Sequence, residues 1–359
     1  MWKLNKAVYG LNQASRQWYD RVNQELCKLG MIRSKYDEAL YYWRSRDNKC
    51  EGIIAIHVDD FLYGGTGRFH KTIIEPLKSV FVIGSFKTTP MKYLGVSIKQ
   101  NKECITLDQK EYILSIEEID VENGRNGNRL LTMKEQRQYR GICGQLNWVA
   151  TQSRPDIAFD VGMLSAKLKE ACVKDLKNAN KVLRKIKSSP EVTLKFPRLK
   201  DPLHLQTFCD ASYANLSNGG SQGGMFVFLA DKEGQVAPLS CTSKRLRRVC
   251  RSTISAETMA MLDSIDTCIW LRHIIEEING AISAVKVKTD NMSLTEAVHS
   301  TTSVEEKRLR VDIAAIRDDI KQNIIVVEWI SKENQVADVL TKQGANQVKL
   351  ICLLKNGRI

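Results

Sequence analysis

Apolar residues recur along the 359-residue chain in two patterns, one with helical spacing and one typical of strands. The spacing near the start predicts a helix over 12–29. Two β-rich runs follow, and residues 52–65 are predicted to form a β-hairpin with Asp59 and Asp60 at its tight turn. A further apolar run predicts a strand over 92–98. The first part of the chain is therefore expected to mix helix and sheet.

The middle of the chain, from 109 to 187, has mainly helical periodicity. Pro155 stands at the first turn of one predicted helix, a position that suits proline. The last of these helices is predicted over 173–187 and carries six basic residues between its apolar ones. The stretch 191–202 contains two prolines and is expected to be a linker.

A second module is predicted to begin near residue 203. Three strands come first, and glycines between the first two suit a turn. A long helix follows over 254–278, then a fourth strand over 284–290. After two more helical stretches comes a fifth strand over 323–330, and 335–342 is expected to open a final helix. This order of elements predicts an α/β module.

Four acids in the second module are notable for the elements that carry them. Asp210 and Asp290 end predicted strands, Glu257 lies one turn into the long helix, and Asp338 lies at the expected start of the last helix. Two close carboxylates repel by about 4 kcal/mol at an effective dielectric of about 20, so four gathered together require a countercharge. Oxygen ligands favour Mg²⁺ or Mn²⁺ over zinc, and paired ions are typical of phosphodiester hydrolysis. Taken singly, each acid is more simply a helix cap or a solvated residue.

Composition narrows the class of protein. The formal net charge of +13 favours a polyanionic partner. Ten cysteines without a CxxC pair fit neither a zinc ribbon nor a disulfide scaffold, so an intracellular protein with reduced thiols is expected, in the cytoplasm or the nucleus. No apolar run long enough for a membrane span is present. Because Met1–Lys3 lead directly into motif-like sequence, the chain is expected to be the C-terminal part of a longer polyprotein.

Within 203–345, the motifs CDAS, SAE, TDN and VADVLTK resemble the ribonuclease H domain of copia-type retrotransposons. The resemblance implies a five-stranded mixed sheet with flanking helices, two Mg²⁺ (or Mn²⁺) ions, and hydrolysis of RNA in RNA–DNA hybrids. Matched motif by motif, the catalytic and metal-binding acids would be Asp210, Glu257, Asp290 and Asp338. Many ribonucleases H carry a histidine before the last acid. This chain has none at that place, which implies altered turnover.

The basic segment 244–251 joins the third strand to the long helix. Its candidate nucleic-acid-binding residues are Lys244, Arg245, Arg247 and Arg248. They either bind phosphates close to the acids or form a solvated loop, and the sequence favours neither alternative.

Residues 3–190 resemble the reverse transcriptase of the same elements. KLNKAVYGLNQASRQWYDRV resembles the segment that frames template and incoming nucleotide, which implies such contacts for Gln13 and Arg16. IHVDDFLYGG resembles the acidic hairpin, so Asp59 and Asp60 would be two of the three polymerase metal ligands. MKYLGVSI, at 91–98, resembles the primer-grip strand. The family's first carboxylate lies before KAVYGL, so polymerase activity is expected to be lost in this chain.

The resemblance also implies a division into domains. Partial reverse transcriptase fingers and palm would occupy 1–100, the thumb and connection 101–200, the ribonuclease H-like domain 203–345, and a tail 346–359. In the thumb, the basic helix offers Lys181, Arg184 and Lys185 either to nucleic acid or simply to solvent. The leading hypothesis is thus a reverse transcriptase/ribonuclease H fragment acting on template–primer and RNA–DNA hybrid. The alternative is a non-catalytic nucleic-acid-binding remnant or a host-adopted element protein.

Overall fold

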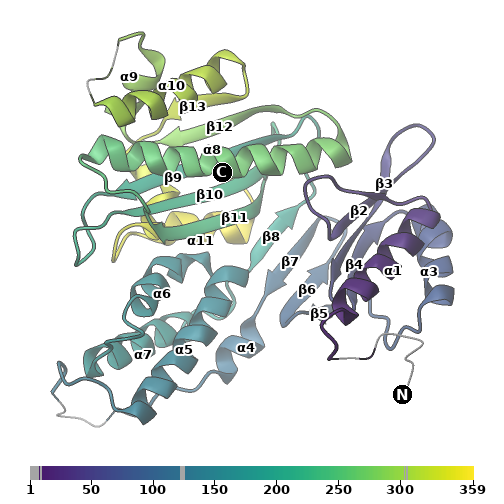
Figure 1. Ribbon diagram of the computed structural model, residues 1–359, viewed down its shortest axis with the longest axis horizontal. Helices are drawn as coiled ribbons and strands as arrows, with labels where there is room; N and C mark the ends of the chain where they lie inside the picture. Colours follow the sequence, from purple (N-terminus) through teal and green to yellow (C-terminus); the bar gives the residue numbers. More distant parts are fainter. Residues whose placement is uncertain (1–7, 9, 122–125, 303, 305) are drawn as a thin grey trace. The chain divides into compact units, whose positions relative to one another are not determined.

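The computed structural model describes residues 8, 10–121, 126–302, 304 and 306–359 (Figure 1). The expectation drawn from Met1–Lys3 lies outside the described residues. The chain divides into two compact units, the first made of Met1–Thr88 with Ile269–Ile282 and the second of Thr89–Cys268 with Ser283–Ile359.

The first unit contains an antiparallel four-stranded sheet in the order β1-β2-β3-β4. Its strands are β1 (Ile32–Arg33), β2 (Leu40–Arg44), β3 (Cys50–His57) and β4 (Asp60–Gly65). The helices are α1 (Ala14–Lys28), α2 (Gly67–Phe69), the π-helix η1 (His70–Ile74) and α3 (Glu75–Val80). Apolar residues of α1, the sheet and the α2–α3 segment form one core. The predicted helix over 12–29 and the predicted hairpin over 52–65 are both present.

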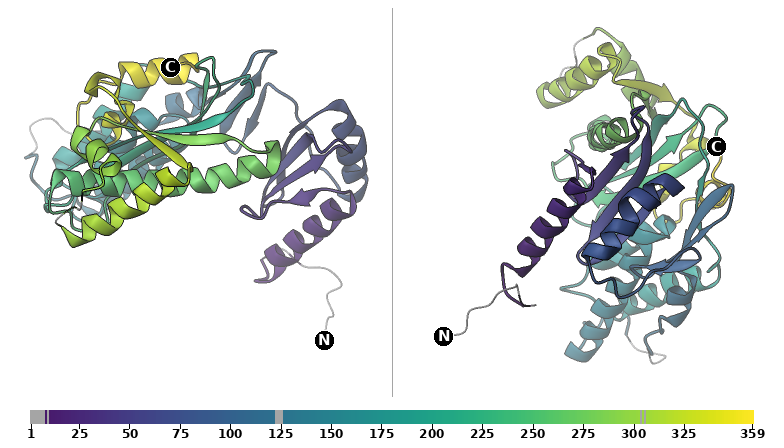
Figure 2. Two further views of the ribbon diagram at one scale, coloured as in Figure 1. Left: turned by 90° about the horizontal axis from the view of Figure 1, so that it is seen from above. Right: turned by 90° about the vertical axis from the view of Figure 1, so that its right-hand side faces the viewer.

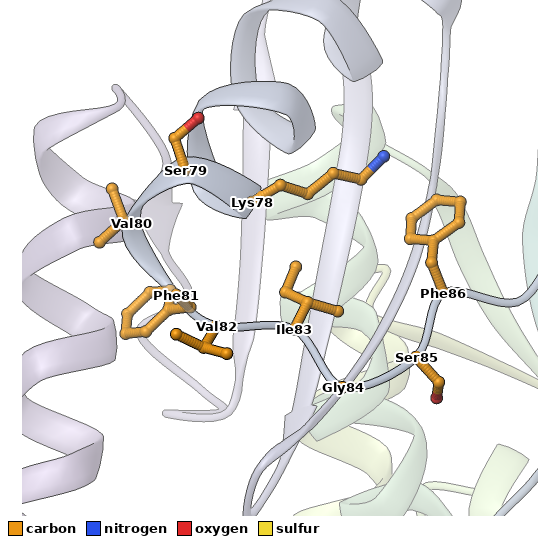
Figure 3. Close-up of a pocket in the computed structure, with 9 residues that line it drawn as sticks. All are labelled: Lys78, Ser79, Val80, Phe81, Val82, Ile83, Gly84, Ser85 and Phe86. Atoms are coloured by element: carbon orange, nitrogen blue, oxygen red, sulfur yellow. The ribbon is translucent and has the colours of Figure 1, made fainter.

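Phe69 is the fully buried centre of this core. Its ring lies against β3 and β4 where both strands have glycine, and a Cβ atom added to Gly52 would lie 2.2 Å from the ring. Glycine at this position therefore makes room for the aromatic side chain. The segment 78–86 begins in the last turn of α3 and continues beyond it, and the Lys78 ammonium lies 3.9 Å from the centre of the Phe86 ring (Figure 3).

The second unit begins with a small antiparallel sheet in the order β5-β6-β7-β8. Its strands are β5 (Met91–Tyr93), β6 (Val96–Gln100), β7 (Cys104–Asp108) and β8 (Leu194–Pro197). The single strand predicted over 92–98 is wrong, because Leu94 and Gly95 have positive φ and turn the chain into a hairpin. The predicted linker over 191–202 is also wrong, since β8 pairs with β7 along four residues.

Four helices of this unit form a bundle with its own core. They are α4 (Lys110–Ser115), α5 (Met133–Gln152), α6 (Ala158–Ser165) and α7 (Val173–Lys187), with the 3₁₀ turn η2 (Pro155–Ile157) between α5 and α6. Thr132 and Glu135 form a capping box that satisfies the first backbone N–H groups of α5. Arg154 and Asp156 form a fully buried ion pair at 2.8 Å beside η2. The helix predicted over 173–187 is confirmed by α7.

A mixed five-stranded sheet follows in the order β11-β10-β9-β12-β13, antiparallel from β11 to β9 and parallel from β9 to β13. Its strands are β9 (His204–Ser212), β10 (Gln222–Ala230), β11 (Val236–Arg245), β12 (Ser283–Thr289) and β13 (Ile325–Trp329). The remaining elements are α8 (Thr253–Asn279), α9 (Met292–His299), α10 (Lys307–Lys321), the 3₁₀ turns η3 (Lys332–Asn334) and η4 (Val336–Leu340), and α11 (Val348–Asn356).

Helices cover both faces of this sheet, with α8 (green) on one face and α11 (yellow) on the other (Figure 2). Three leucines of α11 belong to one core with Phe208 and Phe226 of the sheet and with the η4 residues. The segment 346–359, expected to be a tail, therefore packs into the second unit. The helix predicted to open at 335–342 is the short turn η4, and the final helix begins only at Val348.

Candidate functional site

Three of the four singled-out acids meet at one end of the five-stranded sheet. Asp210 lies near the end of β9, Asp290 directly follows β12, and Asp338 lies within η4. One carboxylate oxygen from each lies within 4.8 Å of the others, and no other group of potential metal ligands this close occurs among the described residues. The strands that carry Asp210 and Asp290, β9 and β12, are parallel neighbours in the sheet. Both strands therefore bring their acids to the same end of the sheet.

Asp210 is the most buried member of the group, with 1% of its surface exposed. Its Oδ2 accepts a hydrogen bond from the Thr341 hydroxyl, and its Oδ1 lies 3.3 Å from the Lys342 ammonium. Burial raises the pKa of Asp210 to about 6, although Lys342 and Thr341 oppose that rise. The nearby charges of Asp338 and Asp290 add to it. The free carboxylate thus lacks full compensation from the protein alone.

Glu257, on the first turns of α8, is the fourth acid. It is buried, and its Oε2 has no hydrogen-bond partner among the described residues. Burial, followed by the charges of Asp210 and Asp290, raises the pKa of Glu257 to about 9. Its carboxylate therefore faces the same group of acids, outside the closest set of three. A buried, unpartnered carboxylate is costly unless a cation or proton compensates it.

Lys342 is a residue of this site that the motif reasoning did not single out. Its ammonium lies 2.5 Å from Asp338 and 3.3 Å from Asp210. Burial lowers the pKa of Lys342, but the two carboxylates outweigh that effect and raise it overall. The sequence did carry a signal, since Asp338 and Lys342 are four residues apart, a spacing that commonly pairs opposite charges on one helical face.

The turn η4 is held against the sheet by contacts close to Asp338. The Gln335 amide donates to the backbone carbonyl of Cys209 at 2.9 Å, and the Ser243 hydroxyl donates to that of Leu340. Gly224, which pairs with Asp210 across β9 and β10, lies directly beneath the turn. A Cβ atom there would lie 2.6 Å from Leu340 and 2.8 Å from Thr341. A missing side chain on β10 therefore permits η4 to approach Asp210.

The donor set fits a divalent cation that prefers oxygen ligands. Three carboxylate oxygens lie close together, a fourth carboxylate is buried without a partner, and no histidine or cysteine joins the group among the described residues. Such a set suits Mg²⁺ or Mn²⁺. In the structure the Lys342 ammonium provides part of the positive charge that such an ion would supply.

The basic segment 244–251 is partly neutralised by the protein itself. Lys244 pairs with Asp263 at 3.0 Å, and Arg248 pairs with Asp312 at 2.7 Å. Arg245 packs next to Gly220, and Arg247 is exposed. The segment therefore presents less free charge than its sequence suggests.

The basic residues of α7 show the same pattern. Arg184 pairs with Glu118 at 2.7 Å and Lys185 with Asp160 at 3.1 Å, while Lys181 is exposed. Two of these three cations thus have acidic partners within the second unit. This arrangement is typical of the solvated face of a helical bundle.

In the first unit, Asp59 and Asp60 lie at the turn between β3 and β4, and both are exposed. Val58 has a positive φ of 57°, and its carbonyl accepts a hydrogen bond of 2.7 Å from the Trp18 indole of α1. No third acid among the described residues lies close enough to form a metal-ligating group with this pair. Gln13 and Arg16 are exposed at the start of α1, where Arg16 pairs with Asp20 at 3.1 Å.

None of the described helices combines the length and the apolar character needed to cross a lipid bilayer. The fold is instead a mixed α/β, multidomain arrangement. A foamy viral protease–reverse transcriptase, solved in complex with an RNA/DNA hybrid, superposes with a TM-score of 0.53 over 94% of this chain and 41% of that chain at 12% identity. A foamy viral protease–reverse transcriptase solved in complex with double-stranded DNA superposes with a TM-score of 0.52. The match covers 90% of this chain and 60% of that chain, at 14% identity. These likenesses show that the chain shares the fold of a reverse transcriptase over most of its length.

Sequence comparison finds relatives among reverse transcriptases and transposon polyproteins. Residues 1–129 match the family described as "Reverse transcriptase (RNA-dependent DNA polymerase)". The retrovirus-related Pol polyprotein from transposon RE1 of Arabidopsis thaliana is 26% identical over 95% of this chain. The putative transposon Ty5-1 protein YCL074W of Saccharomyces cerevisiae is 29% identical over 69% of this chain and 83% of that protein. The chain is therefore similar to the Pol polyproteins of retrotransposons, and it spans 24% of the length of the RE1 relative.

Proposed function

We propose that the chain hydrolyses the RNA strand of RNA–DNA hybrids at the site formed by Asp210, Glu257, Asp290 and Asp338. The observation that carries this proposal is the approach of three carboxylate oxygens, from Asp210, Asp290 and Asp338, within 4.8 Å. The placement of these acids at the edge of a mixed five-stranded sheet supports it. The likeness to a reverse transcriptase bound to an RNA/DNA hybrid supports the choice of substrate.

Asp210, Asp290 and Asp338 would hold the divalent cations, and two Mg²⁺ ions are the number that we propose. When bound, such cations polarise the phosphate and supply the positive charge that the acids lack. Glu257 contributes a further carboxylate once its proton is lost, and its raised pKa makes that loss depend on the cation. Thr341 and Lys342 orient Asp210 by their hydrogen bonds. Recognition of the hybrid would come from its shape and 2′-hydroxyl groups.

For the first unit, we propose that Asp59 and Asp60 do not support DNA synthesis by themselves. Both are exposed, and no third acid among the described residues joins them.

For the domains of the chain, we propose partial fingers and palm over 1–100, thumb and connection over 101–200, and a ribonuclease H-like domain from 203. That domain is extended to include α11, because the α11 leucines share its core.

The proposal is tested with Asp210→Asn and Glu257→Gln in a hybrid-cleavage assay with Mg²⁺. Both variants are expected to lose cleavage while binding the hybrid about as well as the parent, because the changes remove charge and keep shape. Glu296→Gln is the matched control, since Glu296 is an exposed carboxylate on α9. Cleavage by Asp210→Asn at the parental rate would refute the assignment.

The second candidate function is nucleic-acid binding without hydrolysis. The formal net charge of +13 favours it, and so does Lys342, which already places an ammonium between Asp210 and Asp338. The same assay separates the two functions. Salt-dependent hybrid binding without any Mg²⁺-dependent cleavage by the parent protein would identify a binding protein.

A further inference from the structure

A pocket with several polar side chains in its lining lies in the five-stranded sheet, at the end away from the acids. It has a volume of about 450 Å³ and is formed where β9 and β12 begin and where the chain turns from β10 to β11. His204 lies in it and Asp210 lies six residues further along the same strand, a separation of roughly 20 Å in an extended chain. The pocket is therefore distinct from the acidic site.

Two buried polar side chains line this pocket. His204 has 8% of its surface exposed and Gln206 has 4%, and both alternate onto the same face of β9. Neither side chain forms a hydrogen bond with another described residue. Because both side chains line the pocket, their imidazole and amide N–H groups are available to a molecule in it.

Lysine side chains add positive charge to the same pocket. Lys286 and Lys288 of β12 lie beside β9, with Lys286 in register with Gln206, and Lys232 lies on the β10–β11 turn. None of the three has an acidic partner within 4.0 Å in the described part of the chain. Lys288 instead lies 5.2 Å from the centre of the Phe208 ring. Burial and the ammonium groups of Lys286 and Lys288 lower the pKa of His204.

The acidic side chains nearby form no ion pair with these lysines among the described residues. Asp231 lines the pocket, but one of its oxygens accepts the backbone N–H groups of Glu233 and Gln235 at 2.9 and 3.0 Å. Its other oxygen accepts the N–H of Lys200 at 3.3 Å. Asp231 thus stabilises the β10–β11 turn. Glu328 is in register with Lys288 on β13, yet it forms no ion pair with it.

We propose that this pocket binds a ligand through a phosphate group. Ammonium, amide and imidazole N–H groups are the donors that recognise phosphate oxygens. The volume suits a small molecule or a single nucleotide unit and not a duplex. The phosphate has two conceivable sources, a free nucleotide or the end of a nucleic-acid strand. The site lies outside the proposed nuclease centre and uses none of its residues.

The test is calorimetric titration of the full chain with inorganic pyrophosphate, in EDTA so that no cation bridges the ligand to the acids. The parent is expected to bind saturably. The double variant Lys286→Gln/Lys288→Gln is expected to bind about tenfold more weakly or worse, because it loses two charge-assisted contacts. Gln206→Met keeps the volume, removes the amide, and is also expected to weaken binding.

Lys321→Gln is the matched control, because Lys321 is an exposed lysine on α10 of the same unit. Thermal unfolding of every variant is measured to check that the fold is kept. Displacement of pyrophosphate by ADP, and not by a 5′-phosphorylated oligonucleotide, identifies a free nucleotide as the source, and the reverse identifies a strand end. Absence of saturable binding by the parent, or an unchanged affinity in the double variant, overturns the proposal. Since EDTA abolishes any metal-dependent cleavage, this result is independent of the nuclease assignment.

Discussion

Adding one methyl group at Gly224 of β10 should disable the acidic site by displacing the neighbouring turn η4. The new Cβ atom would lie 2.6 Å from the Leu340 Cβ and 2.8 Å from the Thr341 Cγ2, and the Ala337 carbonyl would lie at 3.4 Å. No flexible side-chain end is available to yield at Leu340, so the turn η4 must move outward. That movement would separate Thr341 from Asp210 and carry Asp338 with it.

The magnitude follows from overpacking, which typically costs about 1–3 kcal/mol in a well-packed core. For a unit of this size, about 1 kcal/mol corresponds to a midpoint shift of about 2–4 °C. Gly224→Ala is therefore expected to lower the thermal midpoint by several degrees. Mg²⁺-dependent hybrid cleavage should fall by about 100-fold, because misplacing a reacting group by about 1 Å costs on the order of 100-fold in rate.

Gly144→Ala provides the matched control for this change. Gly144 lies within α5, and an added Cβ there meets nothing within 4 Å. Alanine is a better helix former than glycine by about 1 kcal/mol, so this variant should be slightly more stable and cleave normally. Differential scanning fluorimetry and the hybrid-cleavage assay measure the two effects. If Gly224→Ala bound Mg²⁺ and cleaved like the parent, the close approach of η4 to β10 would be the wrong account of the site.

Three further predictions concern charge and packing. Lys342→Met should lower the thermal midpoint of the Mg²⁺-free protein, because Asp210 and Asp338 lose their countercharge. The same variant should gain more stabilisation than the parent when Mg²⁺ is added. An unchanged effect of Mg²⁺ on the thermal midpoint would contradict this prediction. Because the pKa of Glu257 rises from 4.5 to about 9 on folding, the native state holds a proton that the unfolded state has lost. Stability of the metal-free protein should therefore fall as the pH rises from about 4.5 to about 9, and Glu257→Gln should flatten that decline in urea titrations. In the first unit, Gly52→Ala should lower the free energy of unfolding by about 1–3 kcal/mol or more, because the added methyl group overlaps Phe69. Gly64→Ala is the control, since its methyl group meets nothing within 4 Å. Equal unfolding midpoints for the two variants would refute the packing argument.

Local pattern sufficed for the long elements of the chain. The helical periodicity at 173–187 corresponds to α7, and the apolar runs of the second module correspond to β9 to β13 in their predicted order. The hairpin that carries Asp59 and Asp60 was also predictable, because β-rich apolar runs on both sides of a short acidic turn are a local signal. The acids Asp210 and Asp290 were placed at their strand ends by the same reasoning.

Contacts between distant segments decided the remainder. The stretch 191–202 looked like a linker, yet β8 within it completes a sheet with β7, from which it is separated by the whole helical bundle. The bonds of Arg184 and Lys244 to acids far away in the sequence were equally invisible, although they determine how much basic surface is free. Helical and strand periods follow from neighbouring residues, whereas ion pairs, edge pairing and burial depend on which surfaces meet after folding. For that reason the sequence alone determined which acids are present and on which elements, and only the tertiary structure decided that Gly224 admits η4 and that Lys342 lies between Asp210 and Asp338.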